Sequence, residues 1–160
     1  MTVPRVTVSV DSHCHLQAAA LRGSVGTLVD EARAKGVREI LVAGIVPSEA
    51  TSTVELARIH ELWCSVGCHP CHADEWDPAP IERFLSHPRV VAVHVCGLDY
   101  YHKPYDAVLQ QRVFRAQISM AELSGLPLIL HNRESDADMI RILREEGARA
   151  GVFHCFGADR

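Results

Sequence analysis

The chain has 160 residues, and its 16 lysines and arginines against 20 acidic residues give a formal net charge of −4 and a pI near 6.2. Since sequence-independent binding to nucleic acid requires a clustered excess of positive charge, this balance argues against a protein that holds polyanions by bulk charge. The longest apolar stretch, Ile40 to Val46, is far shorter than a membrane span of roughly 18 residues, and the N-terminus does not resemble a signal peptide. We therefore expect one cytoplasmic domain over residues 1–160.

Six cysteines and ten histidines stand out in this composition. The cysteines lie beside histidines and within strand-like segments, so we expect reduced thiols rather than a disulfide framework. Imidazole is the commonest metal ligand in proteins and the usual general base near neutral pH. The histidines are therefore the main guide to function.

Apolar and polar residues alternate from Val6 to Asp11, which predicts a first strand, and the spacing becomes helical from Ser24 until Gly36. This cycle of strand and helix then repeats along the chain. Further strands are predicted at 39–45, 63–67, 89–97, 128–130 and 151–154, and further helices at 48–60, 80–85, 109–123 and 135–147. Ser135 with Asp138 resembles a capping box for the last helix, whereas residues 73–80, rich in acids and prolines, are expected to form a loop.

Strands that alternate with helices predict an α/β fold with a parallel sheet, either doubly wound or closed into a barrel. Histidines decide between the two. They follow the ends of different predicted strands, where barrel enzymes collect their catalytic groups: His13, His15, His69, His131 and His154. The glycine-rich phosphate turn typical of a doubly wound fold does not follow the first strand. We therefore predict a barrel-type sheet.

His13 and His15 are two residues apart on an extended segment, so both rings leave the same face and can hold one cation. The alternative is a pair of surface histidines at the start of a loop. His131 and His154 end two later strands, and four imidazoles that converge at one mouth of a barrel favour a metal site. Asp11 shares the strand face of the first pair and can orient a ligand.

Arg133 and Glu134 follow His131 at the expected start of a helix, where backbone N–H groups and a guanidinium favour a phosphate oxygen. A solvated helix start is the equally plain alternative. Asp99 and Tyr100 close the fourth predicted strand, and either can contact substrate or stabilise the turn.

The segment from Cys68 to Cys71 has the CxxC spacing of a redox motif, and Cys64 with His72 can complete a structural zinc site. The redox motif normally opens a helix, whereas the residues that follow here are expected to form a loop. We therefore favour a loop on the substrate side that carries incidental cysteines.

Five segments resemble the motifs of the TatD family of metal-dependent deoxyribonucleases, which are amidohydrolase-like barrels. They occur in the family's order and cover nearly the whole chain: DSHCHL at 11–16, VGCHP at 66–70, GLDYY at 97–101, PLILHNRE at 127–134 and VFHCF at 152–156. The resemblance implies a two-metal site that hydrolyses phosphodiester bonds in DNA from the 3′ end through a metal-activated water. It places His13 and His15 on one divalent metal, His131 and His154 on the second, and His69, Arg133 and Glu134 against the substrate.

The chain departs from the family pattern at the fourth strand, where Val95 stands in the position of the glutamate that bridges both metals. Strand alternation predicts that the neighbouring His94 points to the opposite face, which would make it a poor substitute. Without carboxylates the site is rich in nitrogen, so we expect Zn²⁺ or another transition metal rather than Mg²⁺. The catalytic residues stay unassigned, and the alternative function is a degenerate, non-catalytic family member that binds at most a transition metal or phosphate.

The second departure is length, because a complete barrel of this type needs ~250 residues. We expect an incomplete (β/α) barrel of the TIM type, with about six parallel strands and without the last two strands of the family, the final one of which supplies an aspartate. Unpaired edges of a parallel sheet invite pairing with another chain. We therefore expect DNA or another phosphodiester as a partner, no membrane, and self-association through these edges.

Overall fold

The computed structural model describes residues 9–18, 21 and 23–157, and in it a six-stranded parallel sheet runs in the order β1-β2-β3-β4-β5-β6. The predicted strand residues Val6 and Val8 lie outside the described residues. The strands are β1 (Ser9–Cys14), β2 (Val37–Ala43), β3 (Trp63–Val66), β4 (Val90–Asp99), β5 (Leu128–Arg133) and β6 (Gly151–Phe153). All five neighbouring pairs are parallel, as the alternation of strands and helices predicted.

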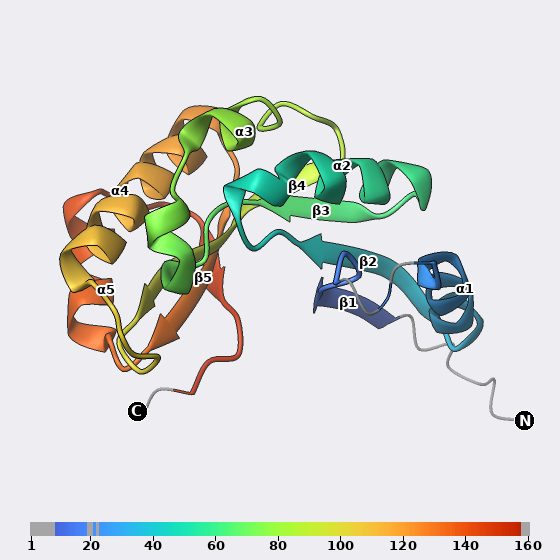
Figure 1. The fold of residues 1–160 in the computed structure, drawn as a ribbon, viewed down its shortest axis with the longest axis horizontal. Coiled ribbons are helices and arrows are strands. Elements are labelled where there is room, and N and C mark those ends of the chain that lie inside the picture. The colour runs from blue at the N-terminus through green and yellow to red at the C-terminus, as the bar shows by residue number, and fades with distance from the viewer. Residues whose placement is uncertain (1–8, 19–20, 22, 158–160) are drawn as a thin grey trace, which may run out of the picture.

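The helices cover the outer, convex side of the sheet, which curls into an arch (Figure 1). They are α1 (Val25–Ala34), η2 (Pro47–Glu49), α2 (Ala50–Ile59), η3 (Pro70–Glu75), α3 (Pro78–Glu82), α4 (Ala107–Ser124) and α5 (Asp136–Glu145), where η marks a 3₁₀ helix. Among the described residues, no helix is long and apolar enough to cross a membrane.

The helix boundaries follow local chemistry, with two corrections to the sequence prediction. The Asp106 carboxylate caps α4 by accepting the Leu109 N–H at 3.0 Å, and Gly125 ends this helix with a φ of 69°. The predicted capping box of α5 is wrong, because the Ser135 hydroxyl faces the acceptors Asn132 Oδ1 at 2.6 Å and the Leu98 carbonyl at 3.2 Å and makes no capping bond with its own helix. Residues 73–80 are not a plain loop either, since η3 ends at Glu75 and α3 begins at Pro78.

Two apolar clusters fill the space between the sheet and its helices. The first joins α1 and α2 to β2 and β3, with Val29 and Val54 almost fully buried. The second joins α4 and α5 to β4 and β5 around Phe114, Met139 and Ile142, which have no exposed surface. Burial of such side chains contributes about 1.5–3 kcal/mol each, so these clusters hold the strand ends in place.

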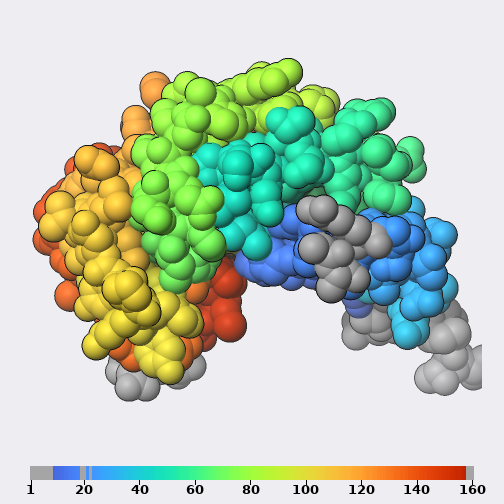
Figure 2. All heavy atoms as spheres, viewed as in Figure 1, coloured from blue at the N-terminus to red at the C-terminus, as the bar shows by residue number. Residues whose placement is uncertain are grey.

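The sheet does not close, and β1 and β6 form its two edges. A cavity of about 540 Å³ lies between these strands, lined by residues that include Leu41, Ile129 and Val152. This side of the arch is visibly hollow between the blue N-terminal strands and the red C-terminal segment (Figure 2). Val10 and Val152 on the edge strands are 61% and 58% exposed. The structure thus confirms the predicted incomplete barrel.

Two glycines allow the strand ends to approach closely. A Cβ at Gly67 would overlap the carbonyl oxygen of His94, and one at Gly97 would overlap that of His131. Gly97 also has a φ of +140°, which side chains rarely adopt. These contacts bring β3, β4 and β5 together where the histidines lie.

Candidate metal centre

The structure brings the four predicted ligand histidines together at the carboxyl end of the sheet. The Nε2 atoms of His13 and His15 are 3.1 Å apart, and the ring of His13 stacks on that of His154 with centroids 4.3 Å apart. His131 Nδ1 lies 3.4 Å from His154 Nε2. All four rings line one open pocket of about 380 Å³. Their role as metal ligands stays a prediction, but their convergence is now a fact of the fold.

Two of these rings have a fixed orientation because one nitrogen is already bound. His15 Nδ1 lies 3.2 Å from the Ala43 carbonyl oxygen, and His131 Nε2 lies 2.8 Å from Asp99 Oδ2. Each of these nitrogens must carry the proton, since both partners only accept hydrogen bonds. In the neutral ring the other nitrogen keeps its lone pair, which is the form that binds a metal.

Asp99 ends β4 and has no exposed side-chain surface. Its carboxylate accepts hydrogen bonds from the backbone N–H groups of Tyr101 and His102, and from the rings of His102 and His131. Burial alone would raise the pKa of this carboxyl, but the hydrogen bonds from His102 and His131 outweigh burial and hold the pKa below its ordinary value. Asp99 thus stays charged and orients His131. The sequence placed it at a strand end but did not reveal this partner.

His69 follows β3 and lies against His131, with ring centroids 4.5 Å apart. Its Nδ1 accepts the Cys71 N–H at 3.1 Å, so the ring proton sits on Nε2. Burial, and after it the charge of His131, lowers the pKa of His69 to about 3. The ring is therefore neutral near pH 7 and presents an N–H donor to the pocket that it lines.

Two buried glutamines on α4 fix the backbone beside these residues. Gln117 accepts the Cys68 N–H at 2.7 Å and donates to the Cys68 carbonyl at 3.0 Å. Gln110 makes the same two-way bridge with the backbone of Asp99, at 2.9 and 3.0 Å. Sequence reasoning missed both glutamines. Their seven-residue spacing on the buried face of α4 was the only signal.

The prediction that His94 points away from the metal residues is wrong. Its ring contacts that of His13 edge to face, with centroids 4.7 Å apart, and also approaches that of His154 at 5.7 Å. The reason is a register shift between Val93 and Cys96 where β4 pairs with β5, which breaks the regular alternation of side chains. Val95 lines the histidine pocket, and His94 contacts the ring of His13, which lines the same pocket.

The residues present fit a divalent metal. Within the described part of the chain, His13 Nδ1 and His94 Nε2 are buried without a hydrogen-bond partner, and ligand atoms of His13, His94 and His154 lie within 4.8 Å of one another. Burial, and after it the charges of neighbouring histidines, lowers the pKa of His13 to about 4 and the pKa of His94 to about 2. Neutral imidazoles with free lone pairs are a donor set for a transition metal.

Arg133 and Glu134 lie at the same end of the sheet but do not line the histidine pocket. Arg133 is the last residue of β5, and its guanidinium lies 4.4 Å above the ring of Tyr101. Helix α5 begins only at Asp136, so these residues precede the helix start instead of forming it. Their contact with substrate stays a prediction.

The CxxC segment has the properties of buried or incidental thiols. Cys68 is buried, and burial raises its pKa to about 12, whereas a redox nucleophile requires a lowered pKa. In the part of the chain that the structure describes, Cys64, Cys68 and His72 do not come close enough together to hold one metal ion. One group does join Cys71 to Asp99, but that carboxylate is already saturated with hydrogen bonds.

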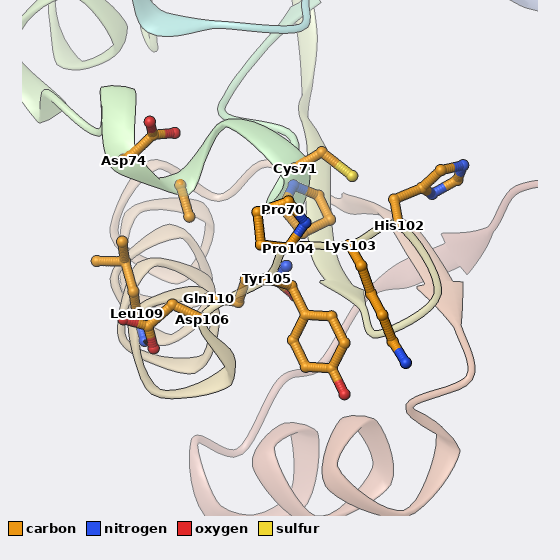
Figure 3. A pocket seen from close by; sticks show the side chains of 11 residues that line it. Pro70, Cys71, Asp74, His102, Lys103, Pro104, Tyr105, Asp106, Leu109 and Gln110 are labelled. Carbon is orange, nitrogen blue, oxygen red and sulfur yellow. Dashed lines mark hydrogen bonds between the residues drawn. The ribbon is translucent and has the colours of Figure 1, made fainter.

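A second hollow, which we call the outer groove, continues from the histidine pocket. It lies between η3 and the segment from His102 to Gln110, and has a volume of about 510 Å³ (Figure 3). Cys71 and His102 line both cavities. The exposed residue Tyr105 lines this groove, and the exposed ring of Tyr101 contacts His102, another lining residue.

A curled parallel sheet with histidines at its carboxyl ends is the architecture of barrel hydrolases that depend on a metal. The profile of the family described as TatD related DNase matches residues 10–160. The chain belongs to this family.

Individual relatives agree with this assignment. An uncharacterised metal-dependent hydrolase, YabD of Bacillus subtilis, is 36% identical over 91% of this chain and 60% of its own length. The 3′-5′ ssDNA/RNA exonuclease TatD of Erwinia tasmaniensis is 35% identical over 83% of this chain and 54% of its own length. The crystal structure of the TatD homologue YjjV from Escherichia coli superposes with a TM-score of 0.87 at 25% identity, covering 94% of this chain and 61% of that one. The chain thus spans about 60% of the length of such relatives.

Proposed function

We propose that this chain carries most of the site of a metal-dependent hydrolase that cleaves phosphodiester bonds in DNA in the 3′ to 5′ direction. The convergence of His13, His15, His131 and His154 in one pocket carries the proposal. The first pair would hold one divalent cation and the second pair another. A bound cation supplies the Lewis acidity that polarises a phosphoryl oxygen and lowers the pKa of water.

The chain's own residues would position the substrate around that centre. The Nε2–H of His69 faces the pocket and can donate to a phosphoryl oxygen, because its Nδ1 is held by the Cys71 N–H. Asp99 keeps His131 in one tautomer.

The surroundings of the outer groove favour a single strand over a duplex. Tyr101 and Tyr105 are 49% and 40% exposed, and aromatic faces of this kind stack on bases without sequence preference. Arg133 over Tyr101 and Lys103 in the groove supply cationic groups for a phosphate, beside the carboxylates of Asp74 and Asp106 that also line the groove. The name of the Erwinia relative, an exonuclease of single-stranded DNA and RNA, supports the same substrate class.

A digestion assay on a single-stranded oligodeoxynucleotide with a 5′ fluorophore tests this function. We expect products that shorten stepwise from the 3′ end, and no products after EDTA treatment. His131→Ala should abolish the digestion, whereas His60→Ala, far from the site, should not change it. Digestion that persists in EDTA and in His131→Ala would rule out the proposed centre.

One observation favours a second function, that of a non-catalytic relative that binds metal or phosphate. Val95 is 2% exposed in the wall of the pocket, where the family resemblance implies a bridging carboxylate. An aliphatic side chain there cannot hold two cations together. Metal binding without any digestion in the same assay would support this second function.

A further inference from the structure

The ring of His94 has an unusual environment for a histidine in a strand. It is fully buried, and its Nδ1 lies 3.0 Å from the Ser65 hydroxyl. Its Nε2 is also buried and has no hydrogen-bond partner among the residues that the structure describes. An unpaired polar atom in the interior is costly, so a buried ring nitrogen that faces other ring nitrogens requires an explanation.

The nitrogens that His94 faces belong to two other histidines from different strands. The ring of His94 is nearly perpendicular to those of His13 and His154, at 86° and 88°. One ligand atom from each of the three lies within 4.8 Å of the others. Ligand nitrogens on a tetrahedral Zn²⁺ lie ~3.3 Å apart, so side-chain movements on the order of 1 Å bring the three to ligand distance.

We propose that His94 is a metal ligand in this chain and forms a three-imidazole site with His13 and His154. The site takes a borderline transition cation, Zn²⁺ or Co²⁺, in preference to Mg²⁺. Ser65 is a positioning residue, because its hydroxyl oxygen accepts the Nδ1–H and leaves the lone pair on Nε2. The inference rests on the histidine pocket of the proposed function but does not require hydrolysis. It takes one ring from each histidine pair, so a single cation in this chain replaces the two that the separate pairs would hold.

The irregularity of β4 makes this assignment consistent with the sequence. Where the register shifts, between Val93 and Cys96, the ring of His94 lies against that of His13, and Val95 lines the histidine pocket. The chain thus lacks a carboxylate at position 95 but gains an imidazole one residue earlier. Replacing an oxygen ligand by a nitrogen ligand favours Zn²⁺ and disfavours Mg²⁺.

The buried Nε2 of His94 has an alternative explanation that involves no metal. The Nε2–H of His94 can point at the face of the His13 ring, as the edge-to-face contact at 4.7 Å allows. In that arrangement His94 is a buried packing residue, and its replacement by another ring leaves metal affinity unchanged.

Zn²⁺ affinity, measured by competition with a chromogenic chelator, distinguishes the two explanations. His94→Phe keeps a buried ring but removes the ligand, and we expect it to weaken Zn²⁺ binding by about 100-fold or more. Ser65→Ala should weaken it by about 10-fold, the scale for loss of a supporting partner. The control, His60→Phe, makes the same substitution outside the site and should leave the affinity unchanged.

Nuclear magnetic resonance of the wild-type protein gives a measurement that does not depend on a variant's folding. In long-range ¹⁵N–¹H spectra, Zn²⁺ should shift the Nε2 resonance of His94 while Nδ1 keeps its proton. An unshifted His94, or a folded His94→Phe protein with wild-type Zn²⁺ affinity, would overturn the proposal. If Zn²⁺ binds through His94 but DNA is not digested, the proposed function fails while this inference stands.

Discussion

Asp99 Oδ2 accepts a hydrogen bond from His131 Nε2 at 2.8 Å, and this contact determines which nitrogen of His131 faces the histidine pocket. An asparagine at position 99 can present its N–H₂ group to the ring and reverse the tautomer. We expect Asp99→Asn to lower divalent metal affinity by roughly 10–100-fold. Titration with Zn²⁺ measures the effect, and Asp30→Asn on α1 is the matched control. Equal affinities in both variants would show that Asp99 only stabilises its turn.

Val95→Glu places a carboxylate in the wall of the histidine pocket, because Val95 is one of its lining residues. With a metal bound, the new carboxylate becomes one of its ligands. We therefore expect tighter binding and a gain in Mn²⁺ or Mg²⁺ affinity relative to wild type. Without metal, a buried charge destabilises the fold. Thermal unfolding with and without Mn²⁺ measures both effects. Val95→Gln, of similar size and without charge, should show neither, and identical curves for the two variants would contradict the prediction.

Acid should destabilise the metal-free protein through its buried histidines. Burial lowers the pKa values of His13, His69 and His94 from 6.5 to about 4, about 3 and about 2. Below pH 6.5 the unfolded chain therefore binds protons that the folded chain does not. The stability contributed by these groups is complete above that pH and is lost as the pH falls toward the folded values.

This pH dependence is checked by melting the protein in EDTA at about pH 7.5 and about pH 5.5, where we expect a clearly lower melting temperature at the acidic pH. His94→Phe removes one of the three groups and should reduce the difference. A melting temperature that does not change over this range would contradict the burial of neutral imidazoles.

Gln117→Leu should destabilise the protein although it adds an apolar side chain to a buried position. The change leaves the N–H and the carbonyl of Cys68 without their partner, and each unsatisfied group costs about 1–3 kcal/mol. Urea unfolding measures the loss, and Ser119→Leu on the exposed side of α4 is the control. A loss no greater than that of the control would mean that the bridge does not stabilise the loop.

The open edges of the sheet should cause self-association. β1 and β6 lie at the two ends of the strand order, and Val152 on β6 is 58% exposed. A lysine on an edge strand discourages pairing with another chain. We expect a mass that rises with concentration in size-exclusion chromatography with light scattering, and less association in Val152→Lys. Val108→Lys, at an exposed position on α4, should behave as wild type. A monomer at every concentration would contradict this prediction.

Much of the fold was predictable because each strand and helix carries its own local pattern. The carboxyl ends of parallel strands lie at one end of the sheet, so the sequence alone predicts that His13, His69 and His131 lie close together. Element ends were less predictable. Ser135 illustrates this, since its hydroxyl faces two acceptors outside α5, the Leu98 carbonyl and Asn132 Oδ1, and makes no capping bond with its own helix.

The rest of the site depends on contacts that no local pattern contains. The position of His94 depends on the register shift in β4, whereas alternation assumes a regular strand. Gln110 and Gln117 have polar side chains on an otherwise apolar helix face, and their partners are backbone groups 11 and 49 residues away. Such contacts become visible only when the elements are packed.

The bridges from α4 also have a consequence for motion. The amide hydrogens of Cys68 and Asp99 are both bonded to side chains of one helix, α4. For either amide to exchange with solvent, α4 must separate from the sheet, because both glutamines are buried. We therefore expect the amides of Cys68 and Asp99, 31 positions apart in the chain, to exchange together, at the rate at which α4 separates from the sheet.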